Sequence, residues 1–165
     1  MLSPDAGSKG SFKQLDILFM ALLAGQILLC VILYFLAGNG ENRSDASAMN
    51  WELSNTFVLV VMALLPGAYV LSRMIYLRRR AEGALLLGLQ RKIEHYRATV
   101  VIQMAVLEGV NLIALVFFFL QGSLVLLLFF ALGLIFFLQV RPSLERFSDD
   151  YEISVAEKQQ LHTEA

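Results

Sequence analysis

The stretch "LVLLLFFALGLIFFL", residues 124–138, contains neither a charged nor a polar side chain. A helix on the surface of a soluble protein keeps a polar stripe for water, and this stretch offers none on any side. Three longer apolar runs occupy residues 17–37, 53–71 and 98–120. Each approaches the roughly 20 residues that cross about 30 Å of hydrocarbon as a helix. The pattern predicts an all-α, polytopic membrane protein with four transmembrane helices.

The composition agrees with this fold class. Of the 165 residues, 58% are hydrophobic and 16% are charged, whereas soluble domains have about 45–50% and about 25%. The length suits a single domain. We expect a disordered N-terminal segment over 1–13, a transmembrane domain over 14–140 and a polar tail over 141–165. Within the domain, helices are predicted at about 14–37, 54–77, 97–120 and 123–140.

The basic residues are distributed unevenly between the connections. Of the 13 Lys and Arg residues, only Arg43 lies between the first two apolar runs, and none lies in the tight turn "LQGSL". All the others fall on the opposite side of the predicted helices. The positive-inside rule therefore predicts that both termini and the connection 78–96 are cytoplasmic, and that 39–53 is on the other side.

The sequence also contains an internal repeat. "MALLAG" (20–25) aligns with "MAVLEG" (104–109) at an offset of 84, and a second offset of 68 aligns Arg73 with Arg141. The difference between the offsets matches a loop that is present in the first half and missing in the second. We therefore expect two tandem helical hairpins of the same orientation, related by a rotation about the membrane normal.

One carboxylate, Glu108, interrupts the third apolar run, with no Lys or Arg within ten residues on either side. At about 1.5 Å per residue, Glu108 and Gln26 lie at matching depth near the bilayer centre. Gln103 and Asn111 fall on the same broad face of the third helix as Glu108. Pro66 lies at this level in the second helix, where a proline kinks the helix and frees a carbonyl. These residues predict a buried polar cluster.

Two roles are open for Glu108. A charged carboxylate at this depth costs at least about 2.5–3.5 kcal/mol, so we expect the protonated acid, donating a hydrogen bond to Gln26 or Asn111. Such a group can hold helices together, a contribution of about 1 kcal/mol. Alternatively it binds and releases a proton or cation. Gly25 and Gly109, at equivalent repeat positions, would allow close approach of the backbones.

Charged residues at the helix ends carry further predictions. Arg78, Arg79 and Arg80 are expected to meet anionic lipid headgroups. Asp16 and Arg73 both lie near ends on the basic side, where they can form an interfacial ion pair. Neither prediction implies a chemical reaction.

The chain has no catalytic or metal-binding motif. His95 and His162 lack metal-ligand spacing, and Cys30 is the only cysteine. A glycine-rich phosphate loop, a nucleophile elbow, HExxH and CxxC are all missing from the sequence. We therefore predict a protein that is not an enzyme, with no metal, no cofactor and no nucleic-acid partner.

Three stretches of the chain carry a resemblance to known proteins: "ALLAGQ", "YRATVVIQMAVLEG" before and within the third run, and "RPSLERFSDDYEIS" after the fourth. Through them, most of the chain resembles a family of small four-helix membrane proteins of Bacteroidetes-type bacteria. The family implies location in the bacterial inner membrane and a four-helix architecture, without an assigned activity.

A more local resemblance, confined to "MAVLEGVNLIALVFFFL", is to the duplicated proteolipid ring subunits of rotary ATPases. Those subunits have a glycine-rich inner helix and place their acid on the second helix of a hairpin, whereas Glu108 is on the first. We therefore do not expect this chain to have the rotary function of those subunits. We expect a non-enzymatic inner-membrane protein, a homo-oligomer or complex subunit in the lipid bilayer, whose polar cluster specifies packing or assembly. A proton or cation channel or carrier that uses Glu108 is the alternative.

Overall fold

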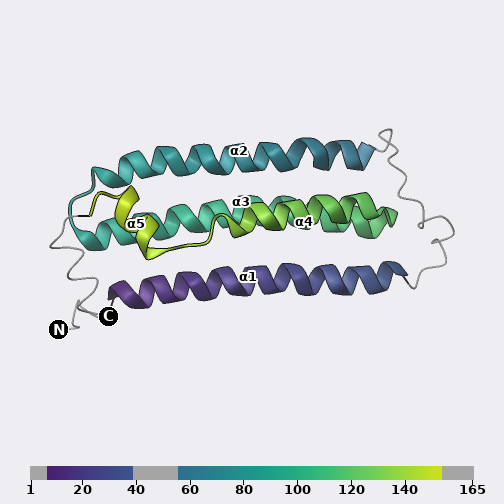
Figure 1. Cartoon of the computed structure of the whole chain (residues 1–165), viewed down its shortest axis with the longest axis horizontal. Helices are drawn as coiled ribbons and strands as arrows, with labels where there is room; N and C mark the ends of the chain where they lie inside the picture. Colours follow the sequence, from purple (N-terminus) through teal and green to yellow (C-terminus); the bar gives the residue numbers. More distant parts are fainter. Residues whose placement is uncertain (1–6, 39–55, 154–165) are drawn as a thin grey trace.

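The structure is a computed structural model that describes residues 7–38 and 56–153. Every regular element in this part of the chain is a helix, and the four longest lie side by side (Figure 1). Three of them are long and apolar enough to cross a membrane, and a fourth apolar helix is shorter. The helices are α1 (Gly7–Gly38), α2 (Thr56–Ala84), α3 (Leu89–Gln121), α4 (Leu124–Leu138) and α5 (Leu144–Asp150).

Helix α3 is the centre of the bundle. It packs against α1, α2 and α4, and α1 and α2 lie on opposite sides of it (Figure 1). Helices α3 and α4 therefore form a closed hairpin, whereas α1 and α2 are held apart by α3. The two halves differ in packing, so the internal repeat stays a prediction from the sequence.

The turn between α3 and α4 is as tight as the sequence predicts. Gly122 follows α3 with a φ of 67°, in the left-handed region, and its N–H donates to the carbonyl oxygen of Phe118 at 2.7 Å. A residue with a side chain rarely adopts this conformation, which is why glycine commonly ends a helix in this way. Helix α4 then begins at Leu124 and runs back along α3.

Three helices extend beyond their predicted ends. Helix α2 continues to Ala84 and α3 begins at Leu89, so the connection predicted over 78–96 is two helix extensions joined by residues 85–88. Helix α1 begins at Gly7, so the disorder predicted for residues 7–13 is wrong. The extensions of α2 and α3 contain good helix formers such as Arg, Ala, Glu and Gln, whereas residues 7–13 are mostly Gly, Ser and Lys. Residues 1–6, the loop predicted over 39–53 and the tail from 154 lie outside the described residues.

We call one end of the bundle the basic end; it comprises the start of α1, residues 85–88 and α5 (Figure 1). Helix α5 begins after Ser143, whose hydroxyl accepts a hydrogen bond from the backbone N–H of Arg146 at 3.1 Å. Such a side-chain cap satisfies a donor that the first turn leaves free. Phe147 and Tyr151 are fully buried, so the first part of the predicted polar tail packs against the bundle.

The hydrophobic core has two large clusters, one towards each end, with a small one between them. Six of the thirteen buried members of the basic-end cluster are aromatic, and each aromatic side chain buries a large apolar area. The basic-end cluster includes Leu15, Phe19, Tyr76, Ile93, Tyr96, Phe137, Phe147 and Tyr151. The cluster at the other end contains Val58, Val61, Ala114, Leu115, Phe118, Val125, Leu126 and Phe130, and Leu65, Ala68 and Val110 lie between.

Candidate functional site

Two amides meet in the middle of the bundle. Asn111 of α3 donates a hydrogen bond from Nδ2 to Oε1 of Gln26 in α1 at 2.8 Å, and both residues are 1% exposed. Gly133 of α4 lies against the Asn111 side chain, because a Cβ at Gly133 would overlap Asn111 Oδ1 and come within 3.2 Å of Leu65 in α2. Asn111 therefore lies where α1, α2, α3 and α4 meet.

Gln103, also predicted in the cluster, connects a different pair of helices. Its Nε2 donates to the backbone carbonyl of Ser72 in α2 at 3.1 Å, and both residues are buried. The carbonyl that accepts is not the one that Pro66 frees, because Ser72 lies six residues further along the helix. Helix α2 runs through Pro66 without ending, and the kink expected there stays a prediction.

Glu108 lies apart from these contacts. Its side chain is half-buried, and within residues 7–38 and 56–153 it has neither a hydrogen bond nor an ion pair. The expected bond to Gln26 or Asn111 is not formed in the structure. At Gly25 and Gly109 a Cβ would meet nothing within 4 Å. The close approach expected at these glycines is therefore not made within the described chain.

The buried amides satisfy only part of their hydrogen-bonding capacity. Within the described residues, Gln26 Nε2, Asn111 Oδ1 and Gln103 Oε1 have no partner. Each buried polar atom left without a partner costs about 1–3 kcal/mol. The amides therefore specify which helices meet, but their atoms without partners lower the stability of the bundle.

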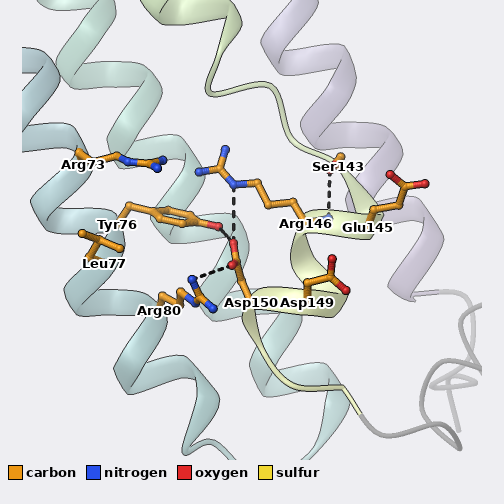
Figure 2. A pocket seen from close by; sticks show the side chains of 9 residues that line it. All are labelled: Arg73, Tyr76, Leu77, Arg80, Ser143, Glu145, Arg146, Asp149 and Asp150. Carbon is orange, nitrogen blue, oxygen red and sulfur yellow. Dashed lines mark hydrogen bonds and ion pairs between the residues drawn. The ribbon is translucent and has the colours of Figure 1, made fainter.

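A pocket of about 400 Å³ opens at the basic end, between α2 and α5. Figure 2 shows side chains from both helices converging on it. Six of its nine lining residues are charged: Arg73, Arg80, Glu145, Arg146, Asp149 and Asp150; Tyr76, Leu77 and Ser143 complete the lining.

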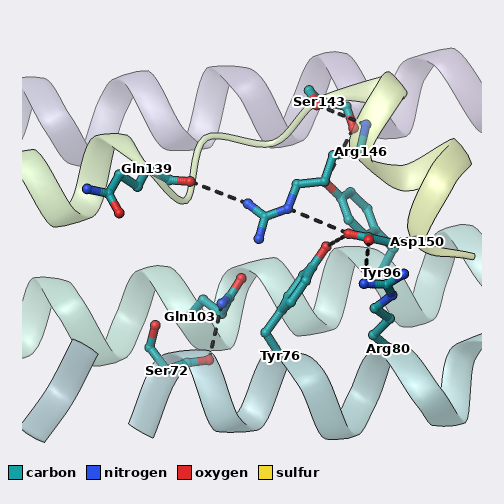
Figure 3. A network of polar contacts seen from close by, with 9 residues as sticks. All are labelled: Ser72, Tyr76, Arg80, Tyr96, Gln103, Gln139, Ser143, Arg146 and Asp150. Carbon is teal, nitrogen blue, oxygen red and sulfur yellow. Dashed lines mark hydrogen bonds and ion pairs between the residues drawn. The ribbon is translucent and has the colours of Figure 1, made fainter. Parts of the chain in front are cut away.

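Asp150 is the centre of the polar network beside this pocket (Figure 3). Arg80 Nη1 lies 3.0 Å from Asp150 Oδ1 and Arg146 Nε lies 3.6 Å from Asp150 Oδ2. The hydroxyl of Tyr76 donates to the same carboxylate, and the Arg146 guanidinium lies 4.3 Å from the centre of the Tyr76 ring. Arg80 and Tyr76 connect this carboxylate of α5 to α2, whereas Arg146 pairs with it within α5.

Tyr151 connects the tail to the start of α3. Lys92 Nζ donates to the Tyr151 carbonyl at 3.1 Å, and His95 Nδ1 lies 3.0 Å from the Tyr151 hydroxyl. Burial raises the pKa of Tyr151, so the ring remains a neutral hydrogen-bonding group. A Cβ at Gly83 would overlap this ring. Gly83 therefore makes room for the tail at the end of α2.

The predicted basic motif is partly used inside the protein. Arg79 Nε donates to Thr99 Oγ1 at 3.0 Å, and Arg80 pairs with Asp150, whereas Arg78 is exposed. Two of the three arginines expected to meet headgroups thus connect α2 to α3 and α5.

Asp16 has a different partner from the one expected. It pairs with Arg141 at 3.5 Å, not with Arg73. Within the described residues Arg73 has no hydrogen bond or ion pair, and its side chain is exposed. The predicted pair does not form because the segment after α4 brings Arg141 to Asp16, near the start of α1.

Sequence reasoning missed the residues of the basic end, although a local signal was present. Arg146 and Asp150 are four residues apart, as are Phe147 and Tyr151, and this spacing puts each pair on one side of a helix. Ser143 before them is a typical N-cap. No group of three His, Cys, Asp or Glu residues in the described segments could hold a metal ion.

No family model matches the chain, and neither a curated protein nor a solved structure is significantly similar to it. The protein is therefore classified by its fold alone. It is an all-helical protein with three helices able to cross a membrane and a shorter fourth apolar helix.

Proposed function

We propose that this protein is a non-enzymatic subunit of the bacterial inner membrane that associates with a second copy of itself through the outer face of α3. One observation carries the proposal: Glu108, in the middle of an apolar helix, is half-buried and has no partner within the described residues. A carboxyl group facing lipid is expensive even when neutral, because lipid tails offer no hydrogen bond. A partner at that face removes this cost.

The surroundings of Glu108 suit close helix contact. Ala105 and Gly109 are exposed and four residues apart, so they lie on the same side of α3. Pairs of small residues at this spacing let transmembrane helices approach closely. A Cβ at Gly109 would meet nothing within 4 Å, which leaves room for a neighbouring backbone.

A second copy is the partner that best fits the chemistry. In a two-fold symmetric contact, the same patch meets itself, so the two Glu108 side chains face one another. A protonated carboxyl group is both a donor and an acceptor. Two of them therefore satisfy each other without any other polar residue.

The oligomer is tested by native mass spectrometry and cross-linking in detergent and in lipid. Gly109→Leu fills the proposed contact and is expected to give monomers, because it prevents the helices from approaching. Gly67→Leu is the matched control: this glycine is also exposed, but it lies on α2. Equal association of the wild type and both variants would contradict the proposal.

We propose further that the basic end is cytoplasmic, which follows from the positive-inside rule. Leu87, in the turn between α2 and α3, is 86% exposed, so a cysteine there is reachable. In a Cys30→Ser background, Leu87→Cys is expected to resist an impermeant thiol reagent added outside intact cells and to react after lysis. Labelling in intact cells would reverse the orientation.

The same lone carboxyl group supports an alternative function, a proton or cation carrier. In this case Glu108→Gln is expected to fold and associate normally but to abolish flux in reconstituted vesicles. The assembly function predicts instead that wild type and Glu108→Gln both show only the flux of empty vesicles. The flux assay thus separates the two functions.

A further inference from the structure

The pocket between α2 and α5 contains an arginine that no contact within the protein explains. Arg73 has no partner in the described residues, although it is beside a network in which Arg80 and Arg146 share Asp150. Figure 2 shows the guanidinium groups of Arg73 and Arg146 pointing toward one another across the pocket. Two facing cations repel, and an anion between them removes the repulsion.

The acidic residues of the pocket do not fill this role. Asp150 is occupied by Arg80, Arg146 and the Tyr76 hydroxyl. Figure 2 shows the carboxylates of Glu145 and Asp149 pointing away from Arg73. The half of the pocket nearest Arg73 therefore has an excess of positive charge.

Apolar surface adjoins this positively charged half of the pocket. Val70, Met74 and Leu77 of α2 are 54%, 49% and 52% exposed, and their spacing puts them on the same side of the helix. Arg73 lies among them, about 25 Å from the start of α2 at about 1.5 Å per residue. This is near the depth at which about 30 Å of hydrocarbon gives way to headgroups.

We propose that this pocket binds the headgroup of an anionic phospholipid. The phosphate lies between Arg73 and Arg146, and the acyl chains lie along Val70 and Met74. Planar guanidinium groups are suited to phosphate because they can donate two parallel hydrogen bonds. The adjoining apolar surface favours a lipid over a soluble anion. The site belongs to one copy of the chain and does not depend on the contact proposed at Glu108.

The test is native mass spectrometry in an uncharged detergent with added phosphatidylglycerol, which measures binding to one protein molecule. Arg73→Gln is expected to lower the affinity about fivefold, corresponding to about 1 kcal/mol per basic residue near an anionic surface. Arg73 has no partner within the described residues, so this variant is expected to fold normally, which a thermal melt verifies. Arg146→Lys keeps the charge but loses the planar donor and is expected to have an intermediate affinity.

Arg91→Gln is the matched control, because Arg91 is an exposed arginine of α3 that does not line the pocket. It is expected to bind phosphatidylglycerol like the wild type. Equal weakening by Arg73→Gln and Arg91→Gln would overturn the proposal. So would equal binding of phosphatidylcholine, or competition by inorganic phosphate at the concentration of the lipid, which would indicate a site for a free anion.

Discussion

The middle of the bundle and its basic end both contain buried polar groups, but these groups differ in how fully they are paired. In the middle, Gln26 and Asn111 share one hydrogen bond and leave two atoms without partners. At the basic end, Asp150 receives two arginines and a tyrosine hydroxyl. In the middle, the atoms without partners lower the stability of the bundle while the amides specify its packing. At the basic end, complementary charges raise the stability.

This difference follows from what surrounds each region. An apolar helix has no preferred side, because every side is equally hydrophobic, so an uncharged amide pair selects which sides meet. The basic end combines polar contacts with exposed surface: the side chain of Arg80 is 45% exposed. Charges there keep part of their hydration, so pairing them costs less than it would in the middle.

The largest expected effect is a clash in the middle. Gly133→Ala places a methyl group on the Asn111 amide and should lower the free energy of unfolding by about 3 kcal/mol, as overpacking does. Unfolding in mixtures of detergent and SDS measures this change. Gly67→Ala is the control, because a Cβ there meets nothing within 4 Å. If Asn111→Ala fails to relieve the effect, the clash is not its cause.

A somewhat smaller and more local effect is expected at the basic end. Asp150→Ala removes the carboxylate shared by Arg80, Arg146 and Tyr76, although Arg146 still donates to the Gln139 carbonyl, and should cost about 2 kcal/mol. Hydrogen exchange should accelerate in α5 and not in the middle of α3. Asp149→Ala is the matched control, since this neighbour is exposed and pairs with nothing in the described chain. Equal exchange in both variants would show that the network does not hold α5.

Gly83→Ala should have a smaller effect than Gly133→Ala, although both put a methyl group onto a side chain. The Tyr151 ring belongs to the tail and can move away, so we expect a cost of about 1 kcal/mol. Limited proteolysis should cut the tail of the variant faster. In a Tyr151→Ala background, Gly83→Ala should not lower the free energy of unfolding further. A further decrease would show that the methyl group disturbs α2 itself.

The smallest effect concerns the amide pair. Asn111→Leu and Gln26→Leu should each cost about 0.6 kcal/mol, the average for hydrogen bonds between transmembrane helices. The double variant should be at least as stable as either single one, because no buried polar atom is then left without a partner. Additive losses in the double-mutant cycle would mean that the two amides act independently.

The sequence predicted the apolar helices and the tight turn, and it placed Gln26 and Asn111 in one polar cluster, although the hydrogen bond it expected there came from Glu108. Run length identifies a helix that can cross a membrane, and equal depth brings polar side chains to one level. The position of Glu108 could not be obtained in this way. Glu108 is about 60° around α3 from Asn111 at about 100° per residue. Which side of α3 is buried depends on how the neighbouring helices pack, and the sequence alone does not show this.

The packing around the glycines could not be predicted from the sequence either. Gly25 and Gly109 face open space, whereas Gly83 and Gly133 accept side chains from elements far away in the chain. A glycine in an apolar run has no signal that distinguishes these cases. The packing of α5 was missed for a different reason: its seven residues offer single pairs at a spacing of four, which are too few to establish a helical period.

Helix α4 has only 15 residues, or about 22 Å at about 1.5 Å per residue. Its outward side is apolar up to Leu138, and the polar Gln139 follows at once. If the helices cross a bilayer as we propose, lipids beside α4 meet polar groups sooner than those beside α1, and a bilayer adapts to a short span by thinning. We therefore expect the free energy of the inserted protein to be lowest where the surrounding bilayer is already thin.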